Sequence, residues 1–285
     1  MTLGQLTENI KHELKSFYNL REIWSFIYMI FEHLEGLDRT AVLAKKDMEI
    51  SDATVEKVKE ITRELKAYKP IQYILGETQF LDLTLEVNPS VLIPRPETEQ
   101  LVSFIIEENI GRSGLKIIDI GTGSGAIAIA LAKKLDARVY ATDISTKAIE
   151  TAKGNAIKNN AQVKFKLHDI LAGYPPVFED GRHKYDIIVS NPPYVLPSDK
   201  NKMSRTVLDY EPEEALFVPE ENPLIFYDAI CRFADDNLAD EGIIYFEINE
   251  YMHREMLEML RSRGYKDVSI LQDFNDKFRV VKVKR

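Results

Sequence analysis

Residues 116–126 read Lys-Ile-Ile-Asp-Ile-Gly-Thr-Gly-Ser-Gly-Ala, an apolar run that passes into a glycine-rich segment. The apolar run predicts a buried strand, and the stretch 126–135 that follows predicts a helix. Glycines between a strand and a helix let the backbone turn sharply and let a ligand approach closely. The segment therefore predicts a strand, a turn and a helix, with a ligand bound at the turn.

The same alternation continues to the end of the chain. Further strands are expected at 138–142, 163–167, 185–190 and 243–248, and helices at 146–159, 223–238 and 253–263. Such alternation is typical of a mainly parallel sheet that helices cover on both faces. Two closing strands, near 266–271 and 278–284, are close enough in sequence to form an antiparallel pair at the sheet edge. We expect one α/β domain over residues 93–285.

The first part of the chain has a different pattern. Residues 1–70 carry apolar side chains at helical spacing, and Gly36 and Pro70 are placed to end helices. These features predict a small helical bundle. Residues 71–92 show partial alternation around Phe80, which predicts a linker containing a short β-hairpin.

Composition and charge argue against several classes of protein. The formal net charge of -9 disfavours a protein that grips a long phosphate backbone, so we expect no direct nucleic-acid binding. The five histidines lack the paired spacings of a zinc site, and we expect no metal. The apolar stretch 23–31 is shorter than the ~20 residues that a membrane-spanning helix needs.

The single cysteine and the N-terminal segment indicate a location. Cys231 has no second cysteine for an intrachain disulfide, which fits a reducing compartment. Residues 1–15 are polar and periodic and lack the apolar stretch of a secretory signal. We expect a cytoplasmic protein with no membrane partner.

Acidic residues at two further strand ends extend the candidate ligand site. Asp143 closes the strand after the glycine turn, where a carboxylate can hold the hydroxyls of a ribose. Asp169 follows the next strand and is placed to meet an adenine edge. We expect a nucleoside-bearing cofactor held by Asp119, Gly121, Thr122, Gly123, Gly125, Asp143, Asp169 and Asn191. The turn alone also satisfies the dinucleotide fingerprint, and a tight connection without a ligand is the structural alternative.

Asn191-Pro192-Pro193-Tyr194 directly follows the expected strand 185–190, so it falls at the same edge of the sheet. Consecutive prolines stiffen the backbone and remove two N–H donors, which leaves carbonyl oxygens as acceptors. An NH2 group could donate one hydrogen to the Asn191 side-chain oxygen and the other to the Pro192 carbonyl, with Tyr194 covering its flat face. A rigid turn with no ligand is the alternative for this motif.

A pair of acceptors suits the chemistry of an amide nitrogen. Such a nitrogen shares its lone pair with the carbonyl and is a poor nucleophile. Two acceptors that hold its hydrogens can orient the lone pair toward an electrophilic methyl group and stabilise the positive charge that develops. Methyl transfer to a planar NH2 nitrogen is therefore the predicted reaction.

The chain resembles the class I methyltransferases with an Asn-Pro-Pro-Tyr signature, and most closely the HemK-type glutamine N5-methyltransferases that modify peptide chain release factors. The resemblance covers nearly the whole chain. It includes 70–77 (Pro-Ile-Gln-Tyr-Ile-Leu-Gly-Glu), 93–99 (Ile-Pro-Arg-Pro-Glu-Thr-Glu), 119–126, 191–194 and 210–212 with Ala215 and Leu216. It implies a Rossmann-like class I methyltransferase domain preceded by the helical bundle, with S-adenosylmethionine as cofactor.

The resemblance also implies roles for particular residues. A glutamine in a Gly-Gly-Gln loop of a release factor would bind to Asn191, Pro192, Pro193 and Tyr194, while the N-terminal bundle docks the factor. Arg95, Glu99 and Phe80 are further substrate-binding candidates, and Thr98 reads as the cap of the helix that follows. The chain departs from the family at Glu247-Ile248-Asn249, where glycine is usual in place of Asn249.

Three alternatives stay open. A glutamine methyltransferase acting on a ribosomal protein would share the catalytic residues. An N6-adenine methyltransferase would use the same pocket for an adenine amino group, but it would need base flipping and a basic base-reading module that the chain lacks. A non-catalytic protein that keeps the fold is the third.

Overall fold

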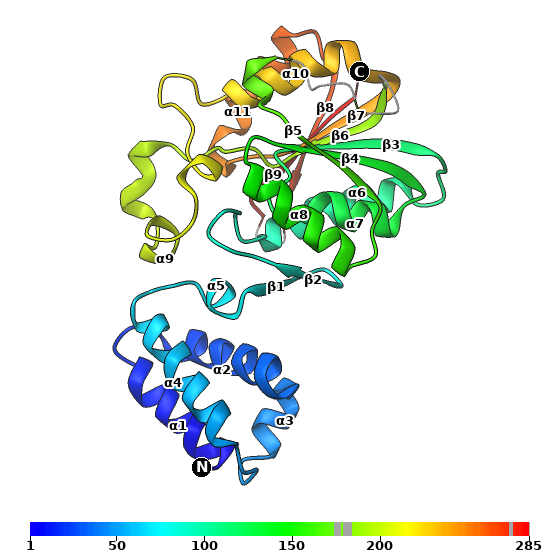
Figure 1. The fold of residues 1–285 in the computed structure, drawn as a ribbon. Coiled ribbons are helices and arrows are strands. Elements are labelled where there is room, and N and C mark those ends of the chain that lie inside the picture. Colours follow the sequence, from blue (N-terminus) through cyan, green and yellow to red (C-terminus); the bar gives the residue numbers. More distant parts are fainter. Residues whose placement is uncertain (174–177, 179–183, 274–275, 285) are drawn as a thin grey trace. The chain divides into compact units, whose positions relative to one another are not determined.

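The computed structural model of the chain describes residues 1–173, 178, 184–273 and 276–284. It divides into two compact units, shown in Figure 1. A helical unit contains Met1–Gly76 and Ser204–Tyr210, and a sheet unit contains Glu77–Met203 and Glu211–Arg285. The break falls after Gly76, inside the segment 71–92 that we expected to link two domains.

The helical unit consists of short amphipathic helices around their own core. Its helices are α1 (Leu3–Leu14), α2 (Leu20–Glu35), α3 (Arg39–Ala44), α4 (Asp52–Lys66), α5 (Ile71–Leu75) and α9 (Arg205–Leu208). Capping boxes begin α1 at Thr2 and α2 at Asn19, and Gly36 ends α2 in the left-handed conformation, as its position predicts. Leucine and isoleucine side chains from α1, α2 and α4 form the buried cluster. The predicted helical bundle is confirmed.

One segment of this unit comes from much later in the chain. The Tyr210 hydroxyl donates a hydrogen bond to the carbonyl of Ala67 at 2.8 Å, and the Arg205 guanidinium lies 4.8 Å from the ring centroid of Tyr68. Helix α9 and the residues around it are therefore part of the helical unit. The predicted helical bundle ended at residue 70 and did not include the segment Ser204–Tyr210.

The sheet unit is built on a mainly parallel sheet with an antiparallel edge pair, as predicted. Within the described residues, its strands are β3 (Leu115–Ile120), β4 (Ala137–Asp143), β5 (Val163–Leu167), β6 (Tyr185–Ser190), β7 (Leu238–Glu247), β8 (Asp267–Gln272) and β9 (Phe278–Lys284). They lie in the order β5-β4-β3-β6-β7-β9-β8, with β9 antiparallel to both of its neighbours. The strand predicted at 243–248 begins earlier, at Leu238.

Helices cover both faces of the sheet. Figure 1 shows α6 (Pro96–Asn109), α7 (Ala126–Lys134) and α8 (Thr146–Lys158) on one face, and α10 (Ile225–Asn237) and α11 (His253–Ser262) on the other. Successive side chains of a strand point to opposite faces. Ile117 therefore packs in the cluster with α6 and α7, while Ile118 packs in the cluster with α10 and α11. Burial on both faces explains the continuous apolar run of β3.

Short 3-10 helices occur in the connections, at Ile170–Ala172, Pro197–Lys202, Glu213–Ala215 and Glu250–Met252. None of the helices in the described parts of the chain combines the length and the apolar composition needed to cross a membrane.

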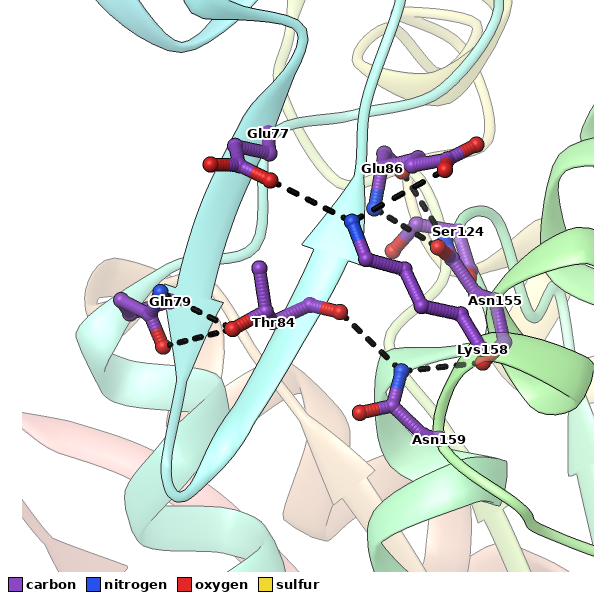
Figure 2. A network of polar contacts seen from close by, with 8 residues as sticks. All are labelled: Glu77, Gln79, Thr84, Glu86, Ser124, Asn155, Lys158 and Asn159. Atoms are coloured by element: carbon purple, nitrogen blue, oxygen red, sulfur yellow. Dashed lines mark hydrogen bonds and ion pairs between the residues drawn. The ribbon is translucent and has the colours of Figure 1, made fainter. Parts of the chain in front are cut away.

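The antiparallel hairpin of β1 (Glu77–Phe80) and β2 (Leu83–Glu86) is fastened to α8 (Figure 2). The buried Asn155 side chain accepts a hydrogen bond from the Glu86 amide at 2.6 Å and donates to the Glu86 and Ser124 carbonyls, both at 2.9 Å. Asn159 donates to the Thr84 carbonyl at 3.0 Å. Asn155 thus joins the hairpin to the glycine-rich turn through one buried amide.

We expect Asn155→Ala to lower the free energy of unfolding by about 3 kcal/mol, because it leaves the buried Ser124 carbonyl and the part-buried backbone groups of Glu86 without their partner. Asn159→Ala is the matched control: its side chain is half-buried, so water can replace the lost bond, and we expect a loss of about 1 kcal/mol. Urea denaturation of both variants measures the difference. Equal losses would show that Asn155 has no special part in holding the hairpin.

Candidate active site

A cavity of about 340 Å³ lies in the sheet unit at the carboxyl ends of the parallel strands. Loops that follow four neighbouring strands line it: the glycine turn after β3, Asp143 after β4, Asp169 after β5 and Asn191 after β6. Of the residues predicted for the site, the cavity brings together Arg95, Gly121, Thr122, Gly123, Asp143, Asp169, Asn191, Pro192 and Pro193. The candidate cofactor and acceptor residues therefore share one cavity.

The glycine turn is held against the end of β4. The amides of Gly121 and Thr122 donate to the Thr142 carbonyl at 2.8 and 2.9 Å, and the Gly123 amide donates to the Asp143 carboxylate at 2.8 Å. Gly121 and Gly123 have positive φ, and a Cβ added to either would meet no atom within 4 Å. The turn thus presents bare backbone with open space above it, which suits close approach of a ligand.

The two acidic residues predicted for the nucleoside are also fixed in place. Asp143 accepts hydrogen bonds from the amides of Gly123 and Ser145, and burial raises the pKa of its carboxyl. Asp169 accepts from the Leu171 amide at 2.9 Å. Beside Asp143, Ile144 is 56% exposed and also lines the cavity, so it offers an apolar surface to a flat base. Sequence reasoning missed Ile144, although an apolar residue directly after the second acid was a visible signal.

Asp119 is fully buried beneath the glycine turn. Its Oδ2 accepts a hydrogen bond from the Thr122 hydroxyl at 2.6 Å, while Oδ1 has no partner among the described residues. Burial, reinforced by the nearby Asp143, raises the pKa of Asp119 to about 7. Asp119 does not line the cavity, and its visible contact is to the turn residue Thr122.

Asn191 lies at the head of a chain of hydrogen bonds that leads into the protein. Its Nδ2 donates to the Thr98 Oγ1 at 3.2 Å, and the Thr98 hydroxyl donates to the Glu247 Oε2 at 2.6 Å. The Tyr194 hydroxyl donates to the other oxygen of Glu247 at 3.2 Å. Thr98 comes from the first turn of α6, and Glu247 ends β7, the neighbour of β6. Three separate segments thus meet behind Asn191.

Glu247 is a buried carboxyl with two hydrogen-bond donors. Burial raises its pKa to about 7, while the bonds from Thr98 and Tyr194 act in the opposite direction. Sequence reasoning did not assign Glu247 to the site. A carboxylate at the end of an apolar strand on the ligand edge, comparable to Asp119 one residue before the end of β3, was the signal that could have found it.

Arg95 is held over the cavity by a second carboxylate that the sequence did not assign. The Arg95 guanidinium lies 2.5 Å from the Glu211 carboxylate, which also accepts a hydrogen bond from the Ile93 amide at 3.2 Å. Glu211 is buried, so this pair fastens the segment before α6 to the loop that follows the Asn-Pro-Pro-Tyr motif.

The family of the chain follows from comparison with known proteins. A model described as a methyltransferase domain matches residues 112–265, and one described as the PrmC N-terminal domain matches residues 10–76. The release factor glutamine methyltransferase of Flavobacterium psychrophilum is 44% identical over 95% of this chain and 94% of its own length. The chain belongs to the release factor glutamine methyltransferases. The Bacteroides thetaiotaomicron member is 39% identical over 99% of this chain and 100% of its own.

A solved structure shares the fold of this methyltransferase. A 16S rRNA methyltransferase of T. thermophilus, in complex with AdoMet and guanosine, aligns with a TM-score of 0.53 and 17% identity over 73% of this chain and 49% of that chain. At this identity the likeness concerns the fold alone. The shared fold agrees with the assignment of the parallel sheet and its antiparallel edge pair to a class I methyltransferase domain.

The residues of the methyltransferase fit S-adenosylmethionine. The open space over Gly121 and Gly123 leaves room for the cofactor to lie close to the backbone. Asp143 and Asp169 line the same cavity, and their carboxylates can accept hydrogen bonds from hydroxyl and amino groups. Ile144 adds an apolar surface beside them. This set of donors and surfaces is what a nucleoside joined to an amino acid requires.

Besides Asp119, four predicted site residues lie elsewhere than the cavity lining. Phe80 is fully buried in the core cluster with α6 and α7, because its strand turns that side chain toward the helices. Glu99 accepts a hydrogen bond from the Leu81 amide at 2.9 Å and so stabilises the hairpin turn. A Cβ at Gly125 would lie 2.9 Å from Ile129, so Gly125 serves helix packing. Tyr194 points its hydroxyl at Glu247.

Thr98 also differs from its expected role. Helix α6 begins at Pro96 with Arg95 as N-cap, so Thr98 lies inside the first turn instead of capping it. Its side chain is buried and bonded to Glu247. The Thr98 hydroxyl therefore bonds to a residue of the site and does not cap the helix.

The raised pKa of Asp119 predicts a pH-dependent stability. The pKa of Asp119 is about 7 in the folded protein and 3.8 in the unfolded chain. Its contribution to stability is therefore fully present below pH 3.8 and is lost as the pH rises through about 7. Because Glu247 behaves alike, the test compares wild type with Asp119→Asn. Thermal unfolding without cofactor should show the variant gaining stability relative to wild type between pH 4 and pH 8, about the range of that shift. A difference in stability between the two proteins that does not change with pH would contradict the raised pKa of Asp119.

Proposed function

We propose that the chain transfers a methyl group from S-adenosylmethionine to the side-chain amide nitrogen of the glutamine in the Gly-Gly-Gln loop of a peptide chain release factor. One observation carries the proposal: Asn191 and Pro192 line the same cavity as the glycine turn and Asp143. Membership of the release factor glutamine methyltransferases supports the choice of acceptor over a ribosomal protein or an adenine.

Gly121, Gly123, Asp143 and Asp169 would hold the cofactor, which supplies a methyl group made electrophilic by a positively charged sulfur. The turn contributes bare backbone, and Asp143 contributes the oxygens that suit ribose hydroxyls. The Asp143 carboxylate is already oriented by two backbone amides. Such preorganisation limits the entropy lost on binding.

The acceptor nitrogen would be held by two oxygens, from the Asn191 side chain and the Pro192 carbonyl. A glutamine amide nitrogen is planar and weakly nucleophilic because its lone pair is delocalised. Hydrogen bonds from its two hydrogens orient the lone pair and stabilise the positive charge that forms with the new N–C bond. The nitrogen then loses one proton to solvent, so no strong base is needed. Pro192 is buried and stiff, so its carbonyl holds a fixed position.

The partner is a protein rather than a nucleic acid. The net charge of -9 opposes a long contact with phosphates, and the helical unit matches the PrmC N-terminal domain over residues 10–76. We assign docking of the release factor to that unit. A cytoplasmic location fits both this partner and the single cysteine, Cys231, which is buried.

We expect Asn191→Ala to lower kcat by roughly 100-fold or more, because one of two acceptors that stabilise the developing charge is lost. The Kd for S-adenosylmethionine should stay close to wild type, since the glycine turn and Asp143 are untouched. Methyl-transfer kinetics and calorimetry measure the two effects. Asn237→Ala, which removes a bond to the Phe233 carbonyl in α10, is the matched control. An Asn191→Ala enzyme with wild-type kcat would refute this mechanism.

The acceptor is tested on the substrate side. We expect a purified release factor to gain one methyl group on the glutamine of its Gly-Gly-Gln loop, and a factor with alanine at that position to gain none. Tandem mass spectrometry locates the methyl group. Unchanged labelling of the alanine factor, or labelling of a ribosomal protein alone, would remove the release factor as substrate.

A further inference from the structure

The hydrogen bonds behind Asn191 restrict how its amide can be oriented. Thr98 has a single hydroxyl proton, and that proton is donated to the Glu247 Oε2 at 2.6 Å. Bonds from a hydroxyl to a carboxylate are stronger than those between neutral groups. The Thr98 oxygen is therefore left with lone pairs only toward Asn191.

An oxygen that can only accept requires a donor opposite it. The Asn191 Nδ2 lies 3.2 Å from the Thr98 Oγ1 and fills that requirement. A 180° flip of the amide would place the Asn191 Oδ1 against the lone pairs of Thr98 and would leave a buried acceptor unsatisfied. The hydrogen bonds from Asn191 to Thr98 and from Thr98 to Glu247 form a relay. This relay selects the amide orientation in which the Asn191 Oδ1 is turned away from Thr98.

We propose that Thr98 and Glu247 are positioning residues that fix the amide of Asn191 so that its oxygen faces the acceptor NH2 group. The inference deepens the proposed function and rests on it. The flipped amide would point its own NH2 group at the acceptor NH2, and two donors repel. Asn191 therefore acts as an acceptor only while the residues behind it hold that orientation.

Tyr194 completes the relay from the other side. Its hydroxyl donates to the Glu247 Oε1 at 3.2 Å, so each oxygen of the carboxylate has one donor. The Tyr227 hydroxyl donates instead to the main-chain carbonyl of Glu247 at 2.9 Å. The side chain and the backbone of Glu247 are thus held by different residues, which separates orientation of the carboxylate from support of the strand.

The relay depends on an ionised Glu247, because a protonated carboxyl can donate to Thr98 and free the Thr98 proton for the flipped Asn191. The charged and titratable groups that face Glu247 are Glu97 of α6, Arg279 of β9, Tyr194 of the loop after β6 and Tyr227 of α10. Burial raises the pKa of Glu247 to about 7, and Glu97 adds to the effect while Arg279 opposes it. Turnover should therefore fall as pH is lowered through about 7.

Two substitutions at one position separate orientation from packing. Thr98→Val keeps the buried shape and removes the hydroxyl, whereas Thr98→Ser keeps the hydroxyl. Single-turnover methyl transfer to a purified release factor is measured at saturating S-adenosylmethionine, together with the Kd for the cofactor and the thermal midpoint. We expect Thr98→Val to lower the rate by roughly 10- to 100-fold with the cofactor Kd unchanged, and Thr98→Ser to restore most of the rate.

Tyr227→Phe is the matched control, because it removes a hydrogen bond to the backbone of Glu247 and leaves the relay complete. It should lower the thermal midpoint and leave the single-turnover rate unchanged. Equal rates for Thr98→Val and wild type would overturn the inference. So would a Thr98→Ser enzyme as slow as Thr98→Val.

A pH profile gives a second, independent test. We expect the wild-type rate to fall on the acid side of about pH 7 and the Glu247→Gln rate to be low and free of that limb, because glutamine does not titrate. Because the pKa of Asp119 is also raised to about 7, the two profiles are compared with Asp119→Asn in both enzymes. An acid limb that persists in Glu247→Gln on that background would overturn the inference. A wild-type enzyme that methylates no release factor would instead refute the proposed function.

Discussion

The parallel order of neighbouring strands is the constraint on which the site depends. Strands β4, β3, β6 and β7 lie side by side in the same direction, so the residues that follow them come together at one edge. That edge carries Asp143, the glycine turn, Asn191 and Glu247 in that order across the sheet. Cofactor and acceptor residues are neighbours in space because their strands are neighbours in the sheet. In the sequence, Asp143 and Glu247 are far apart.

Two buried carboxyls show how this edge trades stability for function. Asp119 and Glu247 are both fully buried and both have a pKa raised to about 7 by that burial. Burying an ionised carboxylate is unfavourable unless hydrogen bonds compensate it. Glu247 has two donors, from Thr98 and Tyr194, whereas one oxygen of Asp119 has none among the described residues. Strained or costly groups of this kind gather at functional sites.

Local patterns in the sequence predicted what local interactions determine. The run 116–126 indicated a strand, a turn and a helix, and the closing strands indicated an antiparallel edge pair; both are present. The cavity also joins the predicted Gly123, Asp143 and Asn191, because each lies within three residues of the end of a predicted strand.

Contacts between distant segments could not be predicted in this way. Thr98 and Glu247 are 149 residues apart, and their bond depends on where α6 packs against β7. Phe80 belongs to the β1–β2 hairpin and Glu99 to the family segment 93–99. The packing of the hairpin decides that Phe80 fills the core and that Glu99 holds the hairpin turn. The inclusion of Ser204–Tyr210 in the helical unit likewise depends on tertiary contacts, such as Tyr210 to Ala67.

The most direct test of the account is a crystal structure of the enzyme with S-adenosylhomocysteine and a Gly-Gly-Gln peptide. We expect the glutamine side-chain nitrogen to lie within hydrogen-bond distance of both the Asn191 Oδ1 and the Pro192 carbonyl oxygen, with the Asn191 Nδ2 still bonded to Thr98. A glutamine bound at another edge of the sheet, or an Asn191 amide that turns its nitrogen toward the glutamine nitrogen, would contradict it.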